Sequence, residues 1–294
     1  MTNRRMLVGL IGANIQGTMS PALFADAFAS ADIDGYYHLI DAETLPGRRL
    51  PELFQSIKAL GFAGANITYP FKQEIIALLD AVDSEAAQVG AVNTVAIAPD
   101  GRTKGYNFDR RGWRNSFAAS FGADAAKDAT VVQIGAGGAG RAVAYALMDL
   151  GVAMLILHDL DAARANVLKS EISAYYGRSR CRLANDLEHD IARADGVVNA
   201  TQVGMKGFPG NPVPVAALKA QHWAADVIYT PMQTAFLKAA AAKGARVLNG
   251  AGMCVYQAAE AFRLITGVAP DVTRLHRAFA TAVAARDAAA VSAA

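Results

Sequence analysis

The feature that most constrains this chain is a strand-like run followed by a glycine-rich turn and the start of a helix. Residues 131–134 form the strand-like run, and Gly135, Gly137 and Gly140 supply the pattern Gly-x-Gly-x-x-Gly directly after it. The helix is expected to begin near Ala139. A buried strand, a turn of this kind and a helix make up the first part of a βαβ unit that binds dinucleotides.

Each glycine of the turn has its own physical role. Gly135 allows the tight turn off the strand, Gly137 lets the backbone approach a pyrophosphate, and Gly140 lets the helix pack close to the strand. The N–H groups and the positive dipole end of the helix then face the pyrophosphate. The candidate cofactor-binding residues of the turn are Gly135, Ala136, Gly137, Gly138 and Ala139.

A glycine-rich turn that binds no ligand is the alternative interpretation, and the residues that follow argue against it. Residues 154–157 predict a second strand, and Asp159 comes after it, 19 positions beyond Gly140. A carboxylate near this distance accepts a hydrogen bond from the adenosine ribose in dinucleotide-binding units. We therefore expect a Rossmann-type domain that begins well inside the chain, with a complete domain before it.

Strand-like and helix-like patterns alternate along the 294 residues, which predicts an α/β fold. We expect a first α/β domain of residues 1–105, completed by C-terminal helices within 251–294, and a Rossmann-type domain of residues 106–250, with a cleft between the two. The strands expected in the first domain are 7–11, 36–39, 62–67 and 95–98, and its helices are one capped by Ser20, then 53–60 and 70–79; strands 196–199, 225–228 and 246–248 are expected later.

Composition excludes several classes of protein. A net charge of +2 argues against a nucleic-acid partner, and no apolar run approaches the roughly 20 residues of a membrane span. The two cysteines, Cys181 and Cys254, and five scattered histidines have neither disulfide nor metal-site spacing, so no metal is expected. Residues 7–15 contain glycines and do not resemble a signal peptide. We expect a cytoplasmic protein with no membrane partner.

Polar residues gather at the ends of the elements expected in the first domain. In an α/β sheet, ligands bind beyond the carboxyl ends of strands and at the helix starts that follow. Taken singly, each residue has a simpler explanation: Ser20 and Asp109 as helix caps, Lys72 as a solvated lysine, and the others as partners of local backbone groups. The clusters are Thr18–Pro21, Asn66–Lys72, Asn93-Thr94 and Gly105–Asp109.

Together these clusters resemble the shikimate/quinate dehydrogenase family over nearly the full length of the chain. Motifs of that family occur here in the family's order and at matching spacing. They are N-x-T-x-P-x-K (Asn66, Thr68, Pro70, Lys72), A-V-N-T (Ala91–Thr94), G-x-N-x-D-x-x-G (Gly105, Asn107, Asp109, Gly112), N-A-T-x-x-G-M (Asn199–Thr201, Gly204, Met205), D-x-x-Y-x-P (Asp226, Tyr229, Pro231) and N-G-x-x-M-x-x-x-Q (Asn249, Gly250, Met253, Gln257).

The resemblance implies a reaction and a set of contacts. Members of the family move a hydride between a nicotinamide and a hydroxylated cyclohexene or cyclohexane carboxylate, which makes the first domain the substrate-binding one. Thr18 and Ser20 would hold the carboxylate, helped by the helix dipole and by Tyr229. By the same resemblance, Asn66, Thr68, Asn93, Asp109 and Gln257 would contact the rest of the substrate, and Thr201 and Gly250 the cofactor.

Lys72 and Asp109 are the expected catalytic acid–base pair. Hydride addition to a ketone builds negative charge on its oxygen, which an ammonium aimed at that oxygen stabilises and can protonate. In the reverse direction a neutral Lys72 would remove the hydroxyl proton. Asp109 would orient Lys72, bond an adjacent hydroxyl and oppose loss of charge from the lysine. The cofactor carries the hydride, so the reaction needs no metal.

Asp159 predicts NAD in preference to NADP. Many NADP-using members carry N-R-T-x-x-R-A after the second Rossmann strand, and the first arginine of that pattern is Leu160 here. Asp159 can accept a hydrogen bond from a free ribose 2′-hydroxyl and would repel a 2′-phosphate, with Asp161 adding to the repulsion. Arg164 is a candidate partner for the 2′-phosphate and would allow some binding of NADP. A role for Asp159 as cap of the following helix would not exclude its contact with the ribose.

Because of three departures from the family pattern, the motifs do not decide which acid is the substrate. Thr18 stands where the family usually has serine, Phe108 where threonine is frequent, and Gln202 where proline or serine is frequent. Shikimate, which is oxidised to 3-dehydroshikimate, and quinate, which is oxidised to 3-dehydroquinate, are both candidate substrates. The sequence is compatible with a biosynthetic or a catabolic role, and with a monomer or a homodimer. The alternatives are a paralogue acting on a related polyol acid such as an aminoshikimate, a non-catalytic ligand-binding relative, and a Rossmann enzyme of another family such as a folate dehydrogenase. The presence of Lys72 and Asp109 argues against the second, and the carboxylate and polyol motifs argue against the third.

Overall fold

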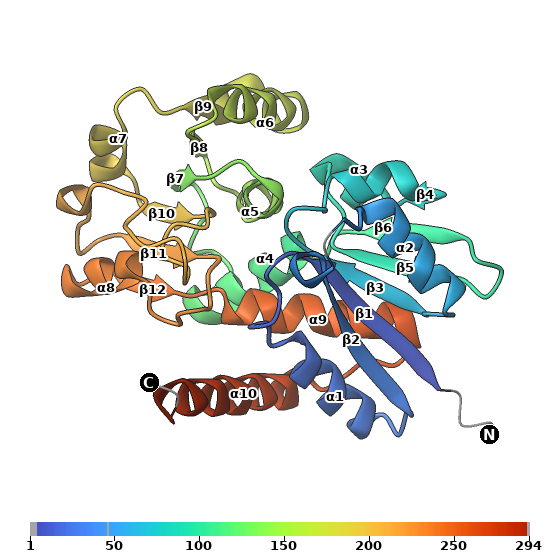
Figure 1. Cartoon of the computed structure of the whole chain (residues 1–294). Helices are drawn as coiled ribbons and strands as arrows, with labels where there is room; N and C mark the ends of the chain where they lie inside the picture. Colours follow the sequence, from blue (N-terminus) through green and yellow to red (C-terminus); the bar gives the residue numbers. More distant parts are fainter. Residues whose placement is uncertain (1–4, 46, 293–294) are drawn as a thin grey trace. The chain divides into compact units, whose positions relative to one another are not determined.

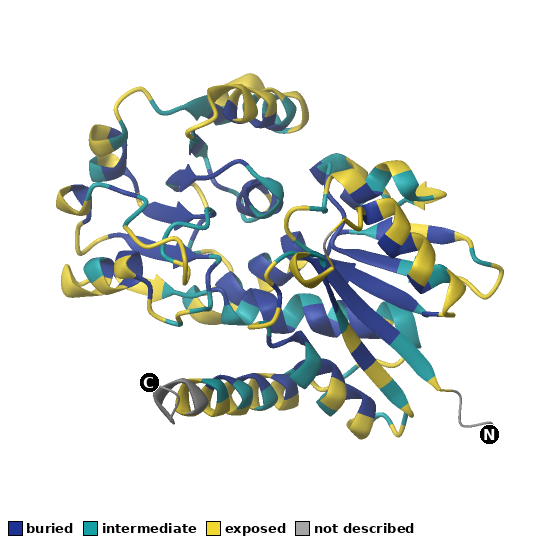
Figure 2. Cartoon of the chain, viewed as in Figure 1, coloured by how far each residue is buried: buried dark blue, intermediate teal, exposed yellow. Residues whose placement is uncertain are grey.

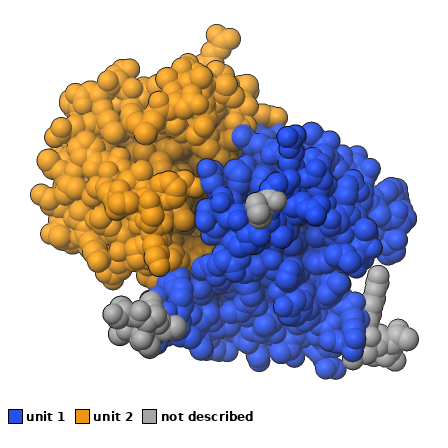
Figure 3. Space-filling view, in the orientation of Figure 1, with its two compact units in different colours: residues 1–108, 254–294 blue, residues 109–253 orange. Residues whose placement is uncertain are grey.

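The alternating strand and helix patterns produce two α/β units, each built on a six-stranded sheet (Figure 1). The computed structural model describes residues 5–45 and 47–292. Unit 1 contains the described residues up to Phe108 and from Cys254 onward, and unit 2 is Asp109–Met253 (Figure 3). Each boundary lies three residues beyond the expected positions 105 and 250. Within the described ranges, no helix combines the length and apolar character that crossing a membrane requires.

The sheet of unit 1 is parallel at one side and mixed at the other. Its strand order is β2-β1-β3-β5-β6-β4. β1 pairs in parallel with β2 and β3, whereas β5 runs antiparallel to both of its neighbours, β3 and β6. The strands are β1 Met6–Gly12, β2 Gly35–Asp41, β3 Gly64–Ile67, β4 Ala81–Val82, β5 Thr94–Ile97 and β6 Thr103–Tyr106.

Helices cover both faces of this sheet. On one face α2 buries Leu50, Leu53, Phe54 and Ile57, the spacing that puts apolar residues on one side of a helix. On the other face the ring of Phe262 in α9 lies 5.8 Å from that of Phe24 and 5.2 Å from that of Phe28 in α1. The helices are α1 Ser20–Ser30, α2 Leu50–Ala59, α3 Ser84–Val89, α9 Ala251–Thr266 and α10 Val272–Ser292, with 3₁₀ turns η1 Ala42–Thr44 and η2 Glu74–Leu78.

The helix predicted for residues 70–79 is wrong, because only η2 is helical there and it is a 3₁₀ turn. The carbonyl of Tyr69 accepts from the N–H of Ala13, and that of Lys72 accepts from the N–H of Val92 over 2.8 Å. Neighbouring segments therefore take the acceptors that an α-helix would use for itself. The peptide bond between Tyr69 and Pro70 is cis.

The prediction that Ser20 caps α1 is also wrong by one position. Ser20 is the first residue of the helix, Met19 occupies the cap position, and no side chain makes the cap hydrogen bond. The Ser20 hydroxyl instead lies 3.2 Å from that of Thr18, within hydrogen-bond distance. The serine oxygen is thus directed to the preceding turn rather than to the helix backbone.

Unit 2 confirms the Rossmann-type prediction. Its sheet is parallel throughout, in the order β12-β11-β10-β7-β8-β9. This is the doubly wound order, in which the strand sequence reverses direction between β7 and β10. The strands are β7 Thr130–Ile134, β8 Met154–His158, β9 Cys181–Leu183, β10 Gly196–Asn199, β11 Trp223–Asp226 and β12 Arg246–Leu248; the helices are α4 Asp109–Phe121, α5 Gly138–Asp149, α6 Ala162–Tyr176, α7 Leu187–Arg193 and α8 Ala235–Ala242, with 3₁₀ turns η3 Arg178–Arg180 and η4 Val215–Ala217.

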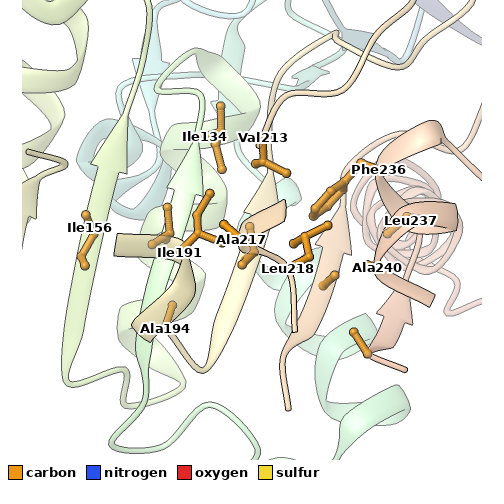
Figure 4. Close-up of a cluster of buried hydrophobic side chains, with 14 residues drawn as sticks. Ile134, Ile156, Ile191, Ala194, Val213, Ala217, Leu218, Phe236, Leu237 and Ala240 are labelled. Atoms are coloured by element: carbon orange, nitrogen blue, oxygen red, sulfur yellow. The ribbon is translucent and has the colours of Figure 1, made fainter. Parts of the chain in front are cut away.

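Apolar side chains fill both faces of the second sheet. On one face Ile191 of α7 and Phe236 of α8 pack with strand residues such as Ile134 (Figure 4). On the other, the ring of Phe117 in α4 lies 4.8 Å from that of Trp223 in β11. Figure 2 shows these strands largely buried, with exposed residues along the outer sides of the helices. The core fixes the strand ends that carry the polar loops.

Candidate active site

The polar clusters of unit 1 meet at one edge of its sheet. β1 and β3 are parallel neighbours, so the loops that follow them leave from the same edge. β5 is antiparallel to β3, which brings its first residue, Thr94, opposite Asn66 at that edge. Thr94 also pairs with Tyr106 at the end of β6. The edge between β1 and β3 is the switch point of this sheet, where ligands of α/β proteins bind.

Asn66 lies at the centre of this edge with all of its polar atoms engaged. The Tyr37 hydroxyl donates to Asn66 Oδ1 over 2.9 Å. Asn66 Nδ2 donates to Thr94 Oγ1 at 3.0 Å and to the carbonyl of Asn93 at 3.3 Å. Asn66 and Asn93 are both buried. Two asparagines predicted to contact substrate therefore lie side by side in a fixed orientation.

Asn93 connects this cluster to α9 and to the end of unit 1. Its Nδ2 donates to Gln257 Oε1 at 3.5 Å, so a residue 164 positions away joins the site. Its Oδ1 accepts from the N–H of Phe108 at 2.9 Å. Phe108 is buried, and its ring stacks on that of Tyr106, with centroids 5.9 Å apart. The structure thus brings together three of the predicted substrate residues, Asn66, Asn93 and Gln257.

The segment Ala91–Asn93 also forms hydrogen bonds with the backbone of Lys72 and with the side chain of Asn107, two residues before Asp109. The N–H of Val92 donates to the carbonyl of Lys72, and Asn107 Nδ2 donates to the carbonyl of Ala91 at 2.9 Å. The Lys72 side chain is half-buried. Asp109 follows Phe108, begins α4 and unit 2, and is only 5% exposed.

The turn that carries Thr18 and Ser20 leads directly into α1. The N–H of Ser20 donates to Thr18 Oγ1 at 3.3 Å, and the N–H of Thr18 donates to the carbonyl of Ile15 at 3.1 Å. Two hydroxyls therefore lie beside the first backbone N–H groups of an 11-residue helix. Hydroxyls and a helix N-terminus are suitable partners for a carboxylate. Thr68, also predicted to contact substrate, donates its backbone N–H to Ile11 at the end of β1.

A buried carboxylate that the sequence analysis missed organises the loop before this turn. Asp41, at the end of β2, is 2% exposed. It accepts from the N–H groups of Asn14, Ile15 and Glu43 and from Gln16 Nε2, at 2.9 to 3.2 Å. Burial acts to raise the pKa of Asp41, but these hydrogen bonds together hold the pKa below its ordinary value. The only sequence signal is an acidic residue two positions after the expected strand 36–39.

The glycine loop of unit 2 has the geometry expected of a pyrophosphate site. Gly135 has a φ of +102°, which favours glycine. A Cβ on Gly140 would lie 2.2 Å from the carbonyl oxygen of Gly135, whereas a Cβ on Gly137 would meet nothing within 4 Å. The loop is thus tight on its inner side and open beside Gly137. With α5 beginning at Gly138, these residues fit a dinucleotide phosphate.

Asp159 reaches the glycine loop from the end of β8. Its Oδ2 accepts from the N–H of Ala136 at 2.7 Å, and its Oδ1 accepts from the N–H of Asp161 at 2.9 Å. The interpretation of Asp159 as cap of α6 is wrong, because Asp161 accepts from the N–H groups of Ala163 and Arg164 there. Arg164 Nη1 lies 4.0 Å from Asp159 Oδ2. Leu160 is 97% exposed.

A second buried carboxylate orders the loops that follow β10 and β11. Asp226 accepts from Asn199 Nδ2 at 3.1 Å, from the N–H of Ile228 at 3.0 Å and from the Thr234 hydroxyl at 2.8 Å. Asn199 Oδ1 in turn accepts from the Thr201 hydroxyl at 2.7 Å. Burial raises the pKa of Asp226 to about 6. In the sequence, Asp226 and Asn199 stand out only as members of two of the family motifs.

The remaining predicted residues lie near these loops of unit 2. A Cβ on Gly135 would lie 2.9 Å from Thr201 Cγ2, so Thr201 is adjacent to the glycine loop. The N–H of Gly250 donates to the carbonyl of Ile228 at 2.9 Å. Tyr229 follows in the same segment, directly before a cis peptide bond between Thr230 and Pro231. Tyr229 and Asp109 thus belong to unit 2, whereas the other predicted substrate residues belong to unit 1.

The fold and these sites define the class of protein. A Rossmann-type unit with a glycine loop at its switch point, joined to an α/β unit with a buried amide cluster, is the architecture of a two-domain nicotinamide-dependent oxidoreductase. Residues 10–95 match the family model described as the shikimate dehydrogenase substrate-binding domain. In the described part of the chain, no three His, Cys, Asp or Glu side chains gather as a metal site would require.

Similar proteins identify the family. A quinate/shikimate dehydrogenase (NAD(+)) of Corynebacterium efficiens is 44% identical over 95% of this chain and 99% of its own. A shikimate dehydrogenase (NADP(+)) of an Arthrobacter species is 41% identical over 98% of this chain and 99% of its own. The solved quinate dehydrogenase from Corynebacterium glutamicum in complex with NAD is 41% identical, covers 95% of this chain and 100% of its own, and superimposes with a TM-score of 0.87. The chain therefore belongs to the shikimate/quinate dehydrogenase family of NAD(P)-dependent oxidoreductases.

Proposed function

We propose that this protein is an NAD-preferring dehydrogenase that interconverts shikimate or quinate and the corresponding ring ketone. The observation that carries the proposal is the hydrogen-bonded cluster of Asn66, Asn93 and Gln257 at the switch point of the first sheet. Side-chain amides both donate and accept, which suits the hydroxyl groups of a polyol ring. Relatives that match the chain over nearly its full length have names that include shikimate or quinate, which are substrates of this type.

Different residues bind the carboxylate and the hydroxyls of the acid. Thr18 and Ser20 hold the carboxylate at the start of α1, and Tyr229 contributes near it. The ring hydroxyls bond Asn66, Thr68, Asn93, Asp109 and Gln257. A site of buried amides disfavours an analogue that lacks a hydroxyl, because its own polar groups would lose their partners.

Lys72 and Asp109 perform the proton transfer. When bound, the nicotinamide accepts or donates the hydride. In ketone reduction, the Lys72 ammonium donates a proton to the oxygen on which negative charge develops. In the reverse reaction, neutral Lys72 Nζ removes the proton of the ring hydroxyl. Asp109 bonds the neighbouring hydroxyl and orients the lysine.

The cofactor residues are those of unit 2. The open side of the loop Gly135–Ala139 holds the pyrophosphate, and Thr201 contributes beside it. Gly250, whose N–H bonds the carbonyl of Ile228, is also assigned to the cofactor. Asp159 accepts from the free ribose 2′-hydroxyl of NAD and repels the 2′-phosphate of NADP. Arg164 is too far from Asp159 for a hydrogen bond, at 4.0 Å, so it neutralises this carboxylate only weakly. NAD is the preferred cofactor for this reason.

Initial rates with each combination of cofactor and acid test the proposal. The protein is mixed with NAD or NADP and with shikimate, quinate or no acid, and formation of the reduced cofactor is followed by absorbance. We expect turnover with at least one acid and a higher kcat/KM for NAD than for NADP. Absence of turnover with both acids contradicts the proposed reaction, and a higher kcat/KM for NADP contradicts the proposed cofactor preference.

A further inference from the structure

Gln133 is a polar side chain in the middle of a buried parallel sheet. It lies in β7 between Val132 and Ile134, is 0% exposed, and has Leu157 and Val198 as its register neighbours. Strands buried on both faces are normally filled with apolar side chains. A buried amide is costly unless its polar atoms find partners. The partners of Gln133 therefore show what this side chain does.

The amide nitrogen of Gln133 bridges the two ends of the glycine loop. Gln133 Nε2 donates to the carbonyl of Gly135 and to the carbonyl of Gly140, both at 2.8 Å. Both amide protons are used, one on the first and one on the last glycine of the pattern. Among the described residues, Gln133 Oε1 has no hydrogen-bond partner. A buried unpaired oxygen is a cost that an apolar residue would not have, so the favourable contribution comes from the two donated bonds.

The bridge is possible because the two ends of the loop lie unusually close together. A Cβ on Gly140 would lie 2.2 Å from the Gly135 carbonyl oxygen and 3.3 Å from Gln133 Nε2. Glycine at position 140 therefore leaves room for both the carbonyl and the amide. Residues 136–139 form the part of the loop between the bridged ends.

We propose that Gln133 is a positioning residue for the dinucleotide: its two hydrogen bonds hold the glycine loop in the shape that presents the N–H groups at the start of α5 to the pyrophosphate. The inference rests on the proposed function of this loop. A loop held in its binding shape before the cofactor arrives costs less to order on binding. Because the pyrophosphate is common to NAD and NADP, loss of the bridge weakens both by the same factor.

The test compares cofactor affinity in three proteins, measured by fluorescence titration with NADH and with NADPH and without any acid. Gln133→Met has nearly the same shape and no donor. We expect the dissociation constants of both cofactors to rise about tenfold, with their ratio unchanged. At saturating NAD, kcat and the KM for the acid stay within about twofold of wild type. Gln133→Leu is the second variant, and it shows the same pattern if the lost donor is the cause.

Val131→Ala is the matched control, because Val131 lies on the same strand, is 0% exposed and makes no bridge to the loop. It lowers the unfolding temperature without changing cofactor affinity. Wild-type affinity in Gln133→Met, or an equal loss in Val131→Ala, overturns the inference while leaving the proposed function intact. A wild-type protein that binds neither NADH nor NADPH contradicts the proposed function and this inference together.

Discussion

Asp159 accepts a hydrogen bond from the backbone N–H of Ala136 across a donor–acceptor distance of 2.7 Å. This bond joins the end of β8 to the glycine loop, so the carboxylate is fixed beside the residues proposed to hold the pyrophosphate. The neighbouring Leu160 is almost fully exposed. A fixed negative charge with no adjacent arginine at position 160 is the physical basis for the proposed preference for NAD.

Changing this charge should change the cofactor preference. In Asp159→Asn combined with Leu160→Arg, the repelling charge is removed and a guanidinium is available to a 2′-phosphate. We expect the ratio of kcat/KM for NAD to that for NADP to fall by at least about tenfold, the equivalent of 1.4 kcal/mol. Steady-state rates with both cofactors measure it. Leu160→Ala is the control and should leave the ratio unchanged; an unchanged ratio in the double variant argues against Asp159 as the determinant.

Lys72 should affect turnover far more than binding. Lys72→Ala removes the proton donor that acts on the carbonyl oxygen in the transition state, a group that typically contributes about 10²- to 10⁴-fold. We expect kcat to fall within this range and the KM for the acid to change much less. The exposed Lys243→Ala serves as the control for loss of a positive charge. Near-normal kcat in Lys72→Ala would remove Lys72 from the catalytic assignment.

Asp41 should affect the acid rather than the cofactor. In Asp41→Asn the side chain presents an NH₂ group to donors that now bond a carboxylate, so at least one hydrogen bond is lost at a cost of about 1–3 kcal/mol. The loop before Thr18 and Ser20 loosens, and we expect a higher KM for the acid with an unchanged KM for NAD. Asp34→Asn is the control, since Asp34 pairs with Arg5 at the surface. Equal changes in both KM values would contradict a local role.

Asp226 should make stability depend on pH in the direction opposite to most carboxylates. Its pKa is raised to about 6 in the folded protein, so the folded state keeps this proton to a higher pH than the unfolded state does. The contribution of Asp226 is therefore present at low pH and is lost as the pH rises toward 6. Asp226→Asn keeps an acceptor for Asn199 and the Ile228 N–H and has no proton to lose.

Denaturant unfolding of wild type and Asp226→Asn between pH 4 and pH 8 measures this effect. We expect the free energy of unfolding of Asp226→Asn, relative to that of wild type, to rise by about 1–3 kcal/mol between pH 4 and 6, with no further change above pH 7. Taking the difference between the two proteins cancels the carboxylates they share, including Asp41. Parallel stability curves across the whole range would show that Asp226 does not titrate as proposed.

The elements that were predictable are those defined by local pattern. The glycine loop, the strand before it and the helix after it follow from neighbouring residues, because each glycine there answers a steric demand within the same turn. The end of β3 was also predictable as the location of Asn66, because ligands of α/β proteins bind beyond the carboxyl ends of strands. Asn93 lies at the same edge for another reason, because it directly precedes β5, which runs antiparallel to β3.

The features that were missed depend on partners distant in sequence. Asp41 bonds a loop 25 to 27 positions before it. Gln257 was expected at the site by resemblance alone, and its contact with Asn93 spans 164 positions. The segment after Pro70 is not an α-helix because Val92 bonds the carbonyl of Lys72 and Ala13 bonds that of Tyr69 directly before it. The role of Gln133 depends on how closely Gly135 and Gly140 approach each other. No local periodicity reports such pairings.

Transfer of an isotopic label tests the central claim most directly. Shikimate or quinate carrying deuterium at the ring carbon that bears the reacting hydroxyl is incubated with NAD and the wild-type protein, and the reduced cofactor is examined by mass spectrometry. The proposed reaction predicts one deuterium in each NADH molecule formed, at a rate that falls with Lys72→Ala. Unlabelled NADH, or no NADH with either acid, would contradict hydride transfer from the ring carbon to the nicotinamide.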